Sequence, residues 1–306
     1  MAARRIARLD HLIAIDGGGT GCRALVATMG GVVLGRGASG SANLMTDPEG
    51  TCRSVVEAVE AAFADAGLPA GAMRRSGAFL GLAGANVSRS GERLKAMLPF
   101  SDCVVVTDSV IAMEGALGPA DGVVAILGTG SVFVARSAGE VRSIGGWGFV
   151  LSDLGSGARL GRALLQEVLL AYDRVHRPSA LTDEVLTRFG NEPGELVAFA
   201  RTAAPRDFGT FAPLLFSFAD RGDPVATRVL DEAVKSIGEA LDTVKPKHCE
   251  RICLLGGLAP LYAKRLESRF QHLLKPPLAD ALQGALALAR KAFVPAGGLP
   301  AGVGHE

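Results

Sequence analysis

The sequence predicts an α/β fold made of two similar halves, and three observations support this prediction. Short apolar runs of the length of buried strands alternate with longer segments of helical periodicity. A unit of strand, glycine turn and strand occurs at residues 11–28 and again at residues 123–136. A third strand follows each unit, at residues 31–37 and 140–144. These repeats predict duplicated mixed-sheet domains, with two unrelated hairpins in a glycine-rich chain as the alternative.

The composition favours a small-molecule ligand. A formal net charge of +1 over 306 residues provides no broad positive field for nucleic acid or an acidic membrane surface. The five cysteines form no CxxC pair, so we expect reduced thiols and a cytoplasmic protein. The start, MAARRIARLD, lacks the apolar core of a secretory signal, and no run of about 18 apolar residues follows. We therefore expect neither export nor a membrane span.

The opening hairpin has the features of a phosphate-binding turn. The buried run Leu12–Ile15 ends at Asp16, and Gly17–Gly19 then remove side chains so that an oxygen-rich group can approach the backbone and positive φ angles carry no penalty. Thr20 adds a hydroxyl. The chain resumes as a strand at Arg23, whereas dinucleotide-binding and P-loop motifs lead into a helix. An acid beside phosphates requires a divalent cation, which predicts Mg²⁺ at Asp16, held partly through water. An ordinary tight hairpin is the alternative.

The rest of the first half alternates between helix and strand. After a polar loop at residues 38–43, the pattern predicts helices at Pro48–Ala66, Arg89–Leu98 and Ser109–Leu117, and strands at Ser76–Ala83 and Cys103–Thr107. Asp108 lies at the junction of the last strand and helix, and this edge of an α/β sheet is where sites usually form. Its carboxylate is therefore either a helix cap or a functional group.

The second half repeats the plan without its aspartate. Gly128–Ser131 forms the second small-residue turn. The segment Gly145–Gly161 holds six glycines, the single tryptophan Trp147 and the acid Asp153, which predicts a long functional loop rather than a regular element. The rest is mostly helical. Helices are predicted at Leu160–Tyr172, Thr182–Arg188, Glu195–Ala203, Phe208–Ala219, Pro224–Val244, Pro260–Phe270 and Ala279–Ala292, with a strand at Arg251–Leu255 that Gly256 and Gly257 end.

Six segments together carry a family resemblance. They are DGGGTGCRALV (16–26), SAN (41–43), VTDS (106–109), ILGTGS (126–131), GGWG with SDLGSG (145–157), and LLGGLA (254–259). In these motifs the chain resembles the sugar kinase, heat-shock chaperone and actin superfamily, and within it the N-acetylglucosamine and glucosamine kinases grouped with the BadF/BadG/BcrA/BcrD ATPases. The resemblance implies a two-lobed actin-like ATPase (ribonuclease H-like) fold with a nucleotide cleft between the lobes.

The domain limits follow from the repeat. We expect an N-terminal lobe over residues 1–118 and a C-terminal lobe over residues 119–306, with a helical insertion at about 165–245. The last helix is expected to pack back at the hinge.

The resemblance also implies ATP and Mg²⁺ as cofactors and assigns residues to them. Asp16 would organise Mg²⁺, and Asp108 would be the catalytic base that accepts the proton of a sugar hydroxyl. The residues assigned to ATP are Gly17, Gly18, Gly19, Thr20, Gly128, Thr129, Gly130 and Ser131 for the phosphates, and Gly256 and Gly257 for the adenine and ribose.

Sugar contacts are expected from Asn43, Asp108, Gly146, Trp147 and Asp153, because carboxylates and amides bind hydroxyl pairs while an aromatic ring covers an apolar sugar face. Asn43 has an Asx turn as its alternative, and Trp147 a role as core anchor. For Asp153 we expect few structural duties.

The chain departs from the family pattern around this acid. Ser152, Leu154, Ala158 and Arg159 replace residues that family members often carry there. This departure puts the preference for an acetylated sugar in doubt and leaves the kinase prediction intact.

The sequence thus predicts an ATP-dependent amino-sugar kinase acting on the 6-hydroxyl of N-acetylglucosamine or glucosamine, with a homodimer as one compatible assembly. One alternative is an ATPase activator of a radical dehydratase or reductase, which needs cysteines that bridge an iron-sulfur cluster. Cys103 and Cys253 lie in apolar runs and are unsuited to this. The other is a non-catalytic sugar sensor, for which the residues before Asp16 offer no DNA-binding module.

Overall fold

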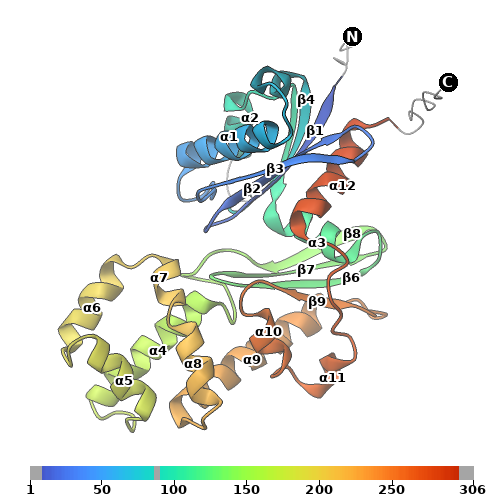
Figure 1. The fold of residues 1–306 in the computed structure, drawn as a ribbon. Coiled ribbons are helices and arrows are strands. Elements are labelled where there is room, and N and C mark those ends of the chain that lie inside the picture. Colours follow the sequence, from blue (N-terminus) through green and yellow to red (C-terminus); the bar gives the residue numbers. More distant parts are fainter. Residues whose placement is uncertain (1–8, 86–89, 296–306) are drawn as a thin grey trace, which may run out of the picture. The chain divides into compact units, whose positions relative to one another are not determined.

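The computed structural model describes residues 9–85 and 90–295, and the chain forms two compact units (Figure 1). One unit contains the chain up to Pro119 together with the chain from Leu278 onward, and the other contains Ala120–Pro277. The last helix therefore belongs to the first unit, whereas the sequence placed it with residues 119–306. Residue 89, where one helix was expected to start, and the first eight residues lie outside the described part of the chain.

The first unit is built on a five-stranded mixed sheet in the order β3-β2-β1-β4-β5. The central strand β1 is antiparallel to β2 and parallel to β4. The strands are β1 (His11–Gly17), β2 (Cys22–Thr28), β3 (Val33–Ser39), β4 (Ser76–Leu82) and β5 (Asp102–Thr107).

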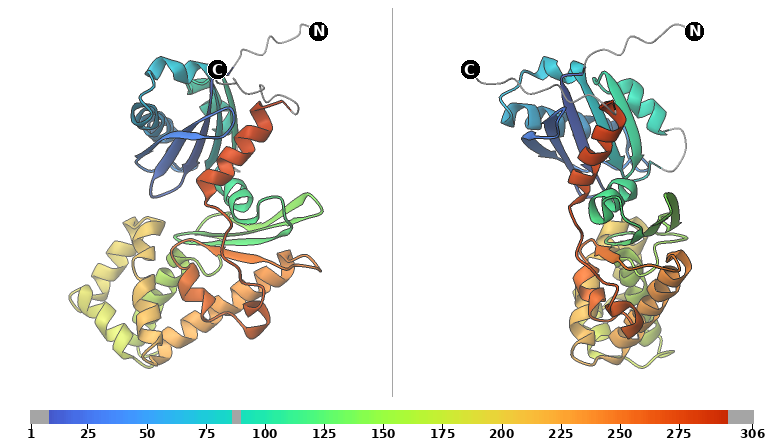
Figure 2. Two further views of the ribbon diagram at one scale, coloured as in Figure 1. Left: turned by 45° about the vertical axis from the view of Figure 1, so that its right-hand side comes forward. Right: turned by 90° about the vertical axis from the view of Figure 1, so that its right-hand side faces the viewer.

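Helices cover both faces of this sheet, because successive side chains of a strand point to opposite sides. Helices α1 and α12 lie on opposite faces of the sheet (Figure 2). Ile13 and Ile15 join the core beneath α1, whereas Leu12 and Ala14 join the core beneath α12. The helices of this unit are α1 (Pro48–Asp65), α2 (Ser90–Met97), α3 (Asp108–Leu117) and α12 (Ala281–Phe293), with a short 3₁₀ helix at Ala70–Arg75.

Glycines allow α3 and α12 to pack at backbone contact distance. A Cβ atom on Gly284 of α12 would lie 2.1 Å from the carbonyl oxygen of Ile111 in α3. A Cβ atom on Gly115 of α3 would lie 2.1 Å from the carbonyl oxygen of Asp280, the N-cap of α12. This close packing attaches the C-terminal helix to the helix that begins at Asp108.

The second unit repeats the central part of the first sheet. Its strands are β6 (Gly122–Leu127), β7 (Ser131–Ser137), β8 (Glu140–Gly145) and β9 (Ile252–Leu255), in the order β8-β7-β6-β9. Strand β6 is antiparallel to β7 and parallel to β9, as β1 is to β2 and β4. An isolated parallel bridge between Ile252 and Leu274 lies where the first unit has its fifth strand. The predicted duplicated mixed sheet is confirmed.

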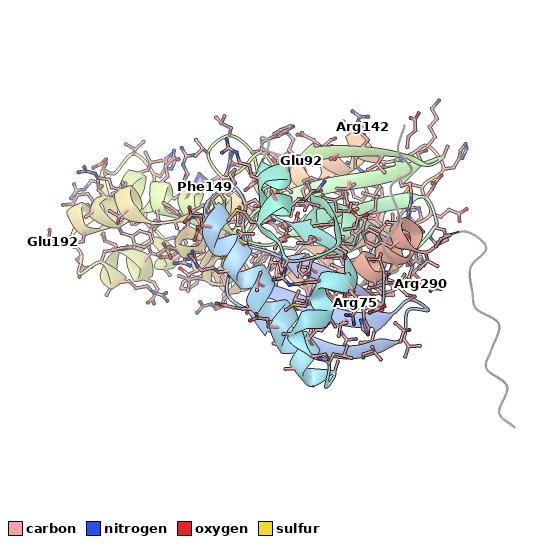
Figure 3. The ribbon with its side chains drawn as sticks, turned by 90° about the horizontal axis from the view of Figure 1, so that it is seen from above. Arg75, Glu92, Arg142, Phe149, Glu192 and Arg290 are labelled. Atoms are coloured by element: carbon pink, nitrogen blue, oxygen red, sulfur yellow. The ribbon has the colours of Figure 1, made fainter. Side chains whose placement is uncertain are left out.

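Helices make up most of the second unit. They are α4 (Gly157–Tyr172), α5 (Ala180–Arg188), α6 (Pro193–Thr202), α7 (Pro205–Gly209), α8 (Ala212–Ala219), α9 (Pro224–Val244), α10 (Ala259–Ala263) and α11 (Ser268–Gln271). Figure 3 labels Glu192, the N-cap of α6, and Arg142 of β8, whose guanidinium donates to the carbonyl oxygen of Thr243 in α9. None of the helices in the described part of the chain has the length and apolar character needed to cross a bilayer.

Three helix predictions are wrong in detail. The segment Phe208–Ala219 is divided between α7 and α8, because Pro213 lacks an N–H and fits the first turn of a new helix. The segment Pro260–Phe270 is divided between α10 and α11, with Leu266 and Phe270 both buried in the core. Helix α4 begins at Gly157 instead of Leu160, because the Ser156 side chain accepts a hydrogen bond from the Arg159 N–H.

Candidate functional site

The first glycine turn is open on its outer side. A Cβ atom on Gly19 would meet nothing within 4 Å, and one on Gly18 only a carbonyl oxygen at 4.0 Å. Gly17 is required for packing instead, since its Cβ would lie 2.6 Å from Leu82. None of the three has a positive φ, so space rather than backbone freedom explains these glycines. Gly19 and the following Thr20 are exposed, which leaves the turn accessible to a ligand.

Asp16 at the base of this turn is held by an arginine that the sequence analysis did not single out. Arg23 Nη2 lies 2.5 Å from Asp16 Oδ2, and Arg23 Nη1 lies 3.9 Å from Asp280 Oδ2. The hydrogen bond from Arg23 to Asp16 is the main reason that the pKa of Arg23 is raised. The register of the hairpin, in which Asp16 faces Arg23 across β1 and β2, is the signal that would have revealed this pair.

Asp108 lies at the same edge of the first sheet as Asp16. It is the first residue of α3, directly after β5, and its Oδ1 accepts a hydrogen bond from the Ser109 N–H at 2.8 Å. Burial raises the pKa of Asp108 to about 6, and the negative charge of Asp16 adds to this, while the Ser109 N–H opposes it. The carboxylate therefore combines a local capping contact with a basicity suited to proton transfer near neutral pH.

Asn43 adopts the structural alternative left open by the sequence. Its Oδ1 accepts a hydrogen bond from the Met45 N–H at 3.0 Å, which is an Asx turn. Asn43 also forms an isolated parallel bridge with Ala83, directly after β4. The neighbouring Ala42 N–H donates to the carbonyl oxygen of Gly18 at 2.9 Å. Asn43 is thus placed beside the first glycine turn.

The second glycine turn is attached to the start of α4. The carbonyl oxygen of Gly128 accepts from the Gly157 N–H at 2.8 Å, and that of Thr129 accepts from the Ala158 N–H at 3.2 Å. Ser131 Oγ donates to the carbonyl oxygen of Leu154 at 2.7 Å. A Cβ atom on Gly128 would meet nothing within 4 Å, so this turn is also open on one side.

Asp153 has structural duties, contrary to our expectation. The residue is buried, and a Cβ atom on Gly130 would lie 2.9 Å from its Oδ2. Burial raises the pKa of Asp153, while the N–H groups of Ser131 and Gly148 and the charge of Arg159 oppose this. Its backbone has a φ of +64°, which is strained for a residue with a side chain. The carboxylate therefore joins the glycine loop (residues 145–157) to the second turn.

Trp147 is not a core anchor. Its side chain is 71% exposed, and Val150 and Leu151 of the same glycine loop are also exposed. Gly146, beside Trp147, has a positive φ and donates its N–H to the carbonyl oxygen of Ser131. A cavity of about 410 Å³ lies next to the loop, lined mainly by side chains of α4 and α6 with Phe149, Val150 and Phe208. No sequence-predicted site residue lines it.

The residues that follow β9 lie against the last residue of β6. A Cβ atom on Gly256 would lie 2.4 Å from the carbonyl oxygen of Leu127, and Gly256 has a φ of +92°. Gly257 is exposed, with nothing within 4 Å of a Cβ atom. The Leu258 N–H donates to the same Leu127 carbonyl oxygen at 3.0 Å. Gly256 and Gly257 thus adjoin the second turn, and the backbone is uncovered at Gly257.

The five cysteines carry thiols and form no disulfide. Cys22 and Cys253 are buried, and Cys103 is partly buried against the core beneath α1. In the described ranges, no three His, Cys, Asp or Glu side chains are grouped so as to hold a metal ion on their own.

Comparisons with known proteins agree with this geometry. Residues 13–286 match the BadF/BadG/BcrA/BcrD ATPase family. Glucosamine kinase GspK of Vibrio cholerae is 37% identical over 284 residues, which cover 92% of this chain and 97% of that protein.

Solved structures extend the likeness to the fold. A protein from Chromobacterium violaceum, described as a candidate N-acetylglucosamine kinase, matches with a TM-score of 0.86 and 33% identity over 92% of this chain and 99% of that one. A ROK family glucokinase from Streptomyces griseus, in complex with glucose and AMPPNP, matches in fold with a TM-score of 0.55 and 18% identity, over 92% and 99% of the two chains. These matches confirm the predicted two-lobed actin-like ATPase fold class. The chain belongs to the BadF/BadG/BcrA/BcrD ATPase family.

Proposed function

We propose that the protein is an ATP-dependent amino-sugar kinase that transfers the γ-phosphoryl group of ATP to the 6-hydroxyl of glucosamine or N-acetylglucosamine. Its relatives from Vibrio cholerae and Chromobacterium violaceum carry these two sugars in their names. The single observation that carries the residue assignment is Asp108, a carboxylate of raised pKa at the same sheet edge as Asp16 and the open first turn.

Asp108 is the proposed catalytic base. With a pKa of about 6 it is ionised at neutral pH and still basic enough to take the proton of a sugar hydroxyl. The hydrogen bond from the Ser109 N–H to Oδ1 fixes the carboxylate at the start of α3. The sugar oxygen then attacks the γ-phosphorus as its O–H bond breaks, and ADP leaves.

The two glycine turns are the proposed phosphate sites, one from each unit. Phosphoryl transfer depends mostly on positioning and on neutralising charge, so N–H groups of an open backbone suit it. Gly18, Gly19 and Gly128 leave the backbone uncovered, and Thr20 and Thr129 add exposed hydroxyls. The exposed backbone at Gly256 and Gly257 is the proposed place for the adenine and ribose.

Asp16 fits a Mg²⁺ ion bound chiefly by phosphate and water. Mg²⁺ commonly takes one or two protein carboxylates together with substrate phosphates, so a single acid at the turn is sufficient. When bound, such an ion would neutralise phosphate charge. Arg23 balances the charge of Asp16 in the structure.

The sugar is proposed to lie against Asn43, Gly146 and Trp147. Because Asn43 Oδ1 is engaged in its Asx turn, its amide nitrogen is the group that we assign to a sugar hydroxyl. The exposed Trp147 ring is available to cover an apolar sugar face. We place Asp153 beside the sugar as the residue that joins this loop to the phosphate turn.

A coupled ATP-consumption assay tests the proposal. Glucosamine, N-acetylglucosamine, N-acetylmannosamine, N-acetylmuramic acid and glucose are compared at equal concentration, and we expect turnover with glucosamine or N-acetylglucosamine to be fastest. The 6-deoxy form of the best sugar is the matched control, and it should bind without turnover. Phosphorylation of the 6-deoxy sugar would exclude the 6-hydroxyl, and ATP use that no sugar stimulates would exclude a sugar kinase.

The remaining parts of the proposal concern setting and partners. We place the reaction in the cytoplasm, where ATP is available and thiols stay reduced. ATP and the sugar are the proposed partners; nucleic acid and membrane are not part of the proposal. A homodimer is the assembly to test, by light scattering of the purified chain.

A further inference from the structure

Tyr262 of α10 joins two segments to which the proposed function gives different ligands. Its side chain is fully buried, and its hydroxyl donates to the carbonyl oxygen of Gly155 at 2.6 Å. The ring packs edge-on against Phe216, with 5.2 Å between the ring centroids. The aromatic ring thus belongs to the core, while the hydroxyl makes a single directed contact with the glycine loop.

The acceptor, Gly155, lies between residues that hold the second glycine turn. On one side Leu154 accepts the hydrogen bond of Ser131 Oγ, and on the other Gly157 donates to Gly128. Gly155 has a φ of +68°, and a Cβ atom there would lie 2.5 Å from Ile237. The position of this carbonyl group therefore affects both the glycine loop and the phosphate turn.

Tyr262, the donor, is connected through backbone hydrogen bonds to the segment that begins at Gly256 and Gly257. The Tyr262 N–H donates to the carbonyl oxygen of Leu258, and the Leu258 N–H donates to that of Leu127, the last residue before the second turn. A ligand that presses on the exposed backbone at Gly256 and Gly257 would act on the start of α10. Tyr262 lies one helical turn further along, and its hydroxyl is bonded to Gly155.

We propose that Tyr262 is a positioning residue that couples nucleotide binding at Gly256 and Gly257 to the geometry of the glycine loop, and hence to sugar affinity. This inference rests on the proposed function, which places the nucleotide at one end of this connection and the sugar at the other. Coupling between two binding sites is reciprocal, so sugar binding must tighten nucleotide binding by the same factor.

Tyr262→Phe is the sharpest test, because it keeps the ring in its core position and removes only the hydroxyl. The chain has two tyrosines, and the other, Tyr172 at the end of α4, is 53% exposed. Tyr172→Phe is therefore the matched control for loss of one phenolic hydroxyl. A second variant, Ile237→Val, removes a methyl group beside Gly155 and leaves the hydrogen bond, so it reports a purely structural loosening of the loop.

The main readout is the affinity for a non-hydrolysable ATP analogue with and without saturating sugar. Trp147, the single tryptophan, lies in the glycine loop and reports loop changes by fluorescence. We expect sugar to tighten analogue binding about fivefold or more in the wild type, Tyr172→Phe and Ile237→Val, within the usual range for allosteric coupling. In Tyr262→Phe the factor should fall to about twofold or less, while the affinity for the analogue alone stays within about threefold of the wild type.

Amide hydrogen exchange gives a second readout that does not depend on the identity of the sugar. Binding of the analogue should slow exchange across residues 145–157 in the wild type and in Tyr172→Phe, and should not do so in Tyr262→Phe. An unchanged coupling factor in Tyr262→Phe, or its equal loss in Ile237→Val, would overturn the positioning role. Sugar phosphorylation by the wild type is measured first, since its absence would refute the proposed function rather than the role of Tyr262.

Discussion

The two glycine turns have the same topology but differ in what supports them. Each joins two antiparallel strands, of which the first also pairs in parallel with a later strand. Each turn is closed by its own backbone, the first from the Gly18 N–H to the carbonyl oxygen of Gly21 and the second from the Gly128 N–H to that of Gly130. The first has Asp16 at its base. The second is tied to the start of α4 and to the buried Asp153. Duplication has kept the strands and the open backbone, while the acids have diverged.

This difference indicates that the acids of the two units have different roles. The carboxylate of Asp16 is 18% exposed and paired with the exposed side chain of Arg23, which suits the metal-binding role proposed for it. The carboxylate of Asp153 is buried against Gly130 and suits a fixed support. We therefore expect substitutions in the first unit to affect chemistry and ligand binding, and equivalent substitutions in the second to affect stability as well.

The largest effect is expected from Asp108→Asn in the first unit. The amide keeps the shape of the side chain and can still accept the Ser109 N–H, but it cannot take a proton. We expect kcat for the sugar to fall by about 10²–10⁴-fold, the usual contribution of a general base, with ATP affinity little changed. Steady-state kinetics and ATP-analogue binding measure the two quantities.

Asp102→Asn is the matched control for this variant, since Asp102 lies at the other end of β5 and its side chain accepts from its neighbour Cys103. It should retain wild-type kcat. Full activity in Asp108→Asn would refute the assignment of Asp108 as the catalytic base, and with it the proposal that the first unit provides the chemistry.

The pH dependence of the wild type is the next largest effect. Since the base must be ionised and burial raises the pKa of Asp108 to about 6, kcat/KM for the sugar should fall about tenfold for each pH unit below 6. The pKa is higher in the folded state, so the folded protein binds more protons between about pH 4 and 6, and its stability decreases as pH rises through this window. Asp108→Asn should therefore melt at a higher temperature than the wild type at pH 7.

Thermal unfolding at pH 4 and pH 7 checks the sign. The advantage of Asp108→Asn should shrink toward pH 4, where the wild-type carboxyl group is protonated in the folded state. A pH–rate profile that stays flat down to pH 4 would show that Asp108 is not the titrating base.

A pair of alanine substitutions compares the turns directly. Gly19→Ala adds a methyl group where nothing lies within 4 Å, so stability should be unchanged while KM for ATP rises about tenfold, or about 1.4 kcal/mol of binding. Gly130→Ala places a methyl group 2.9 Å from Asp153 Oδ2, so it should cost about 1–3 kcal/mol of the free energy of unfolding. Urea denaturation and ATP kinetics on both variants test the contrast, and equal destabilisation by the two would contradict it.

The features that the sequence predicted well depend on nearby residues. Strand, glycine turn and strand can be read from a short window, and so can the junction that places Asp108 after β5. Local capping also explains why Pro224–Val244 was predicted to the residue, since Pro224 opens that helix and the apolar stripe is continuous.

The features that the sequence did not predict depend on distant contacts. The sequence led us to expect that the last helix packs back at the hinge, but not that it packs against α3, because the glycines that permit this contact, Gly115 and Gly284, are far apart in the chain. The burial of Asp153 depends likewise on Gly130. An acid among glycines resembles a ligand-binding group until the neighbouring turn is placed against it.

The smallest effect is expected from Ser131→Ala in the second turn. Ser131 is buried, and its hydroxyl donates to the carbonyl oxygen of Leu154, so the substitution removes one of the hydrogen bonds between turn and loop. Loss of a buried hydrogen bond should lower the free energy of unfolding by about 1 kcal/mol.

The matched control is Cys22→Ala, because Cys22 occupies the corresponding position of the first turn and is buried. No loop equivalent to residues 145–157 is attached there, so Cys22→Ala should not change sugar kinetics. Ser131→Ala should raise KM for the sugar as well as for ATP, because a loosened glycine loop affects both binding sites. If only the free energy of unfolding changes, this hydrogen bond contributes to stability and not to ligand binding.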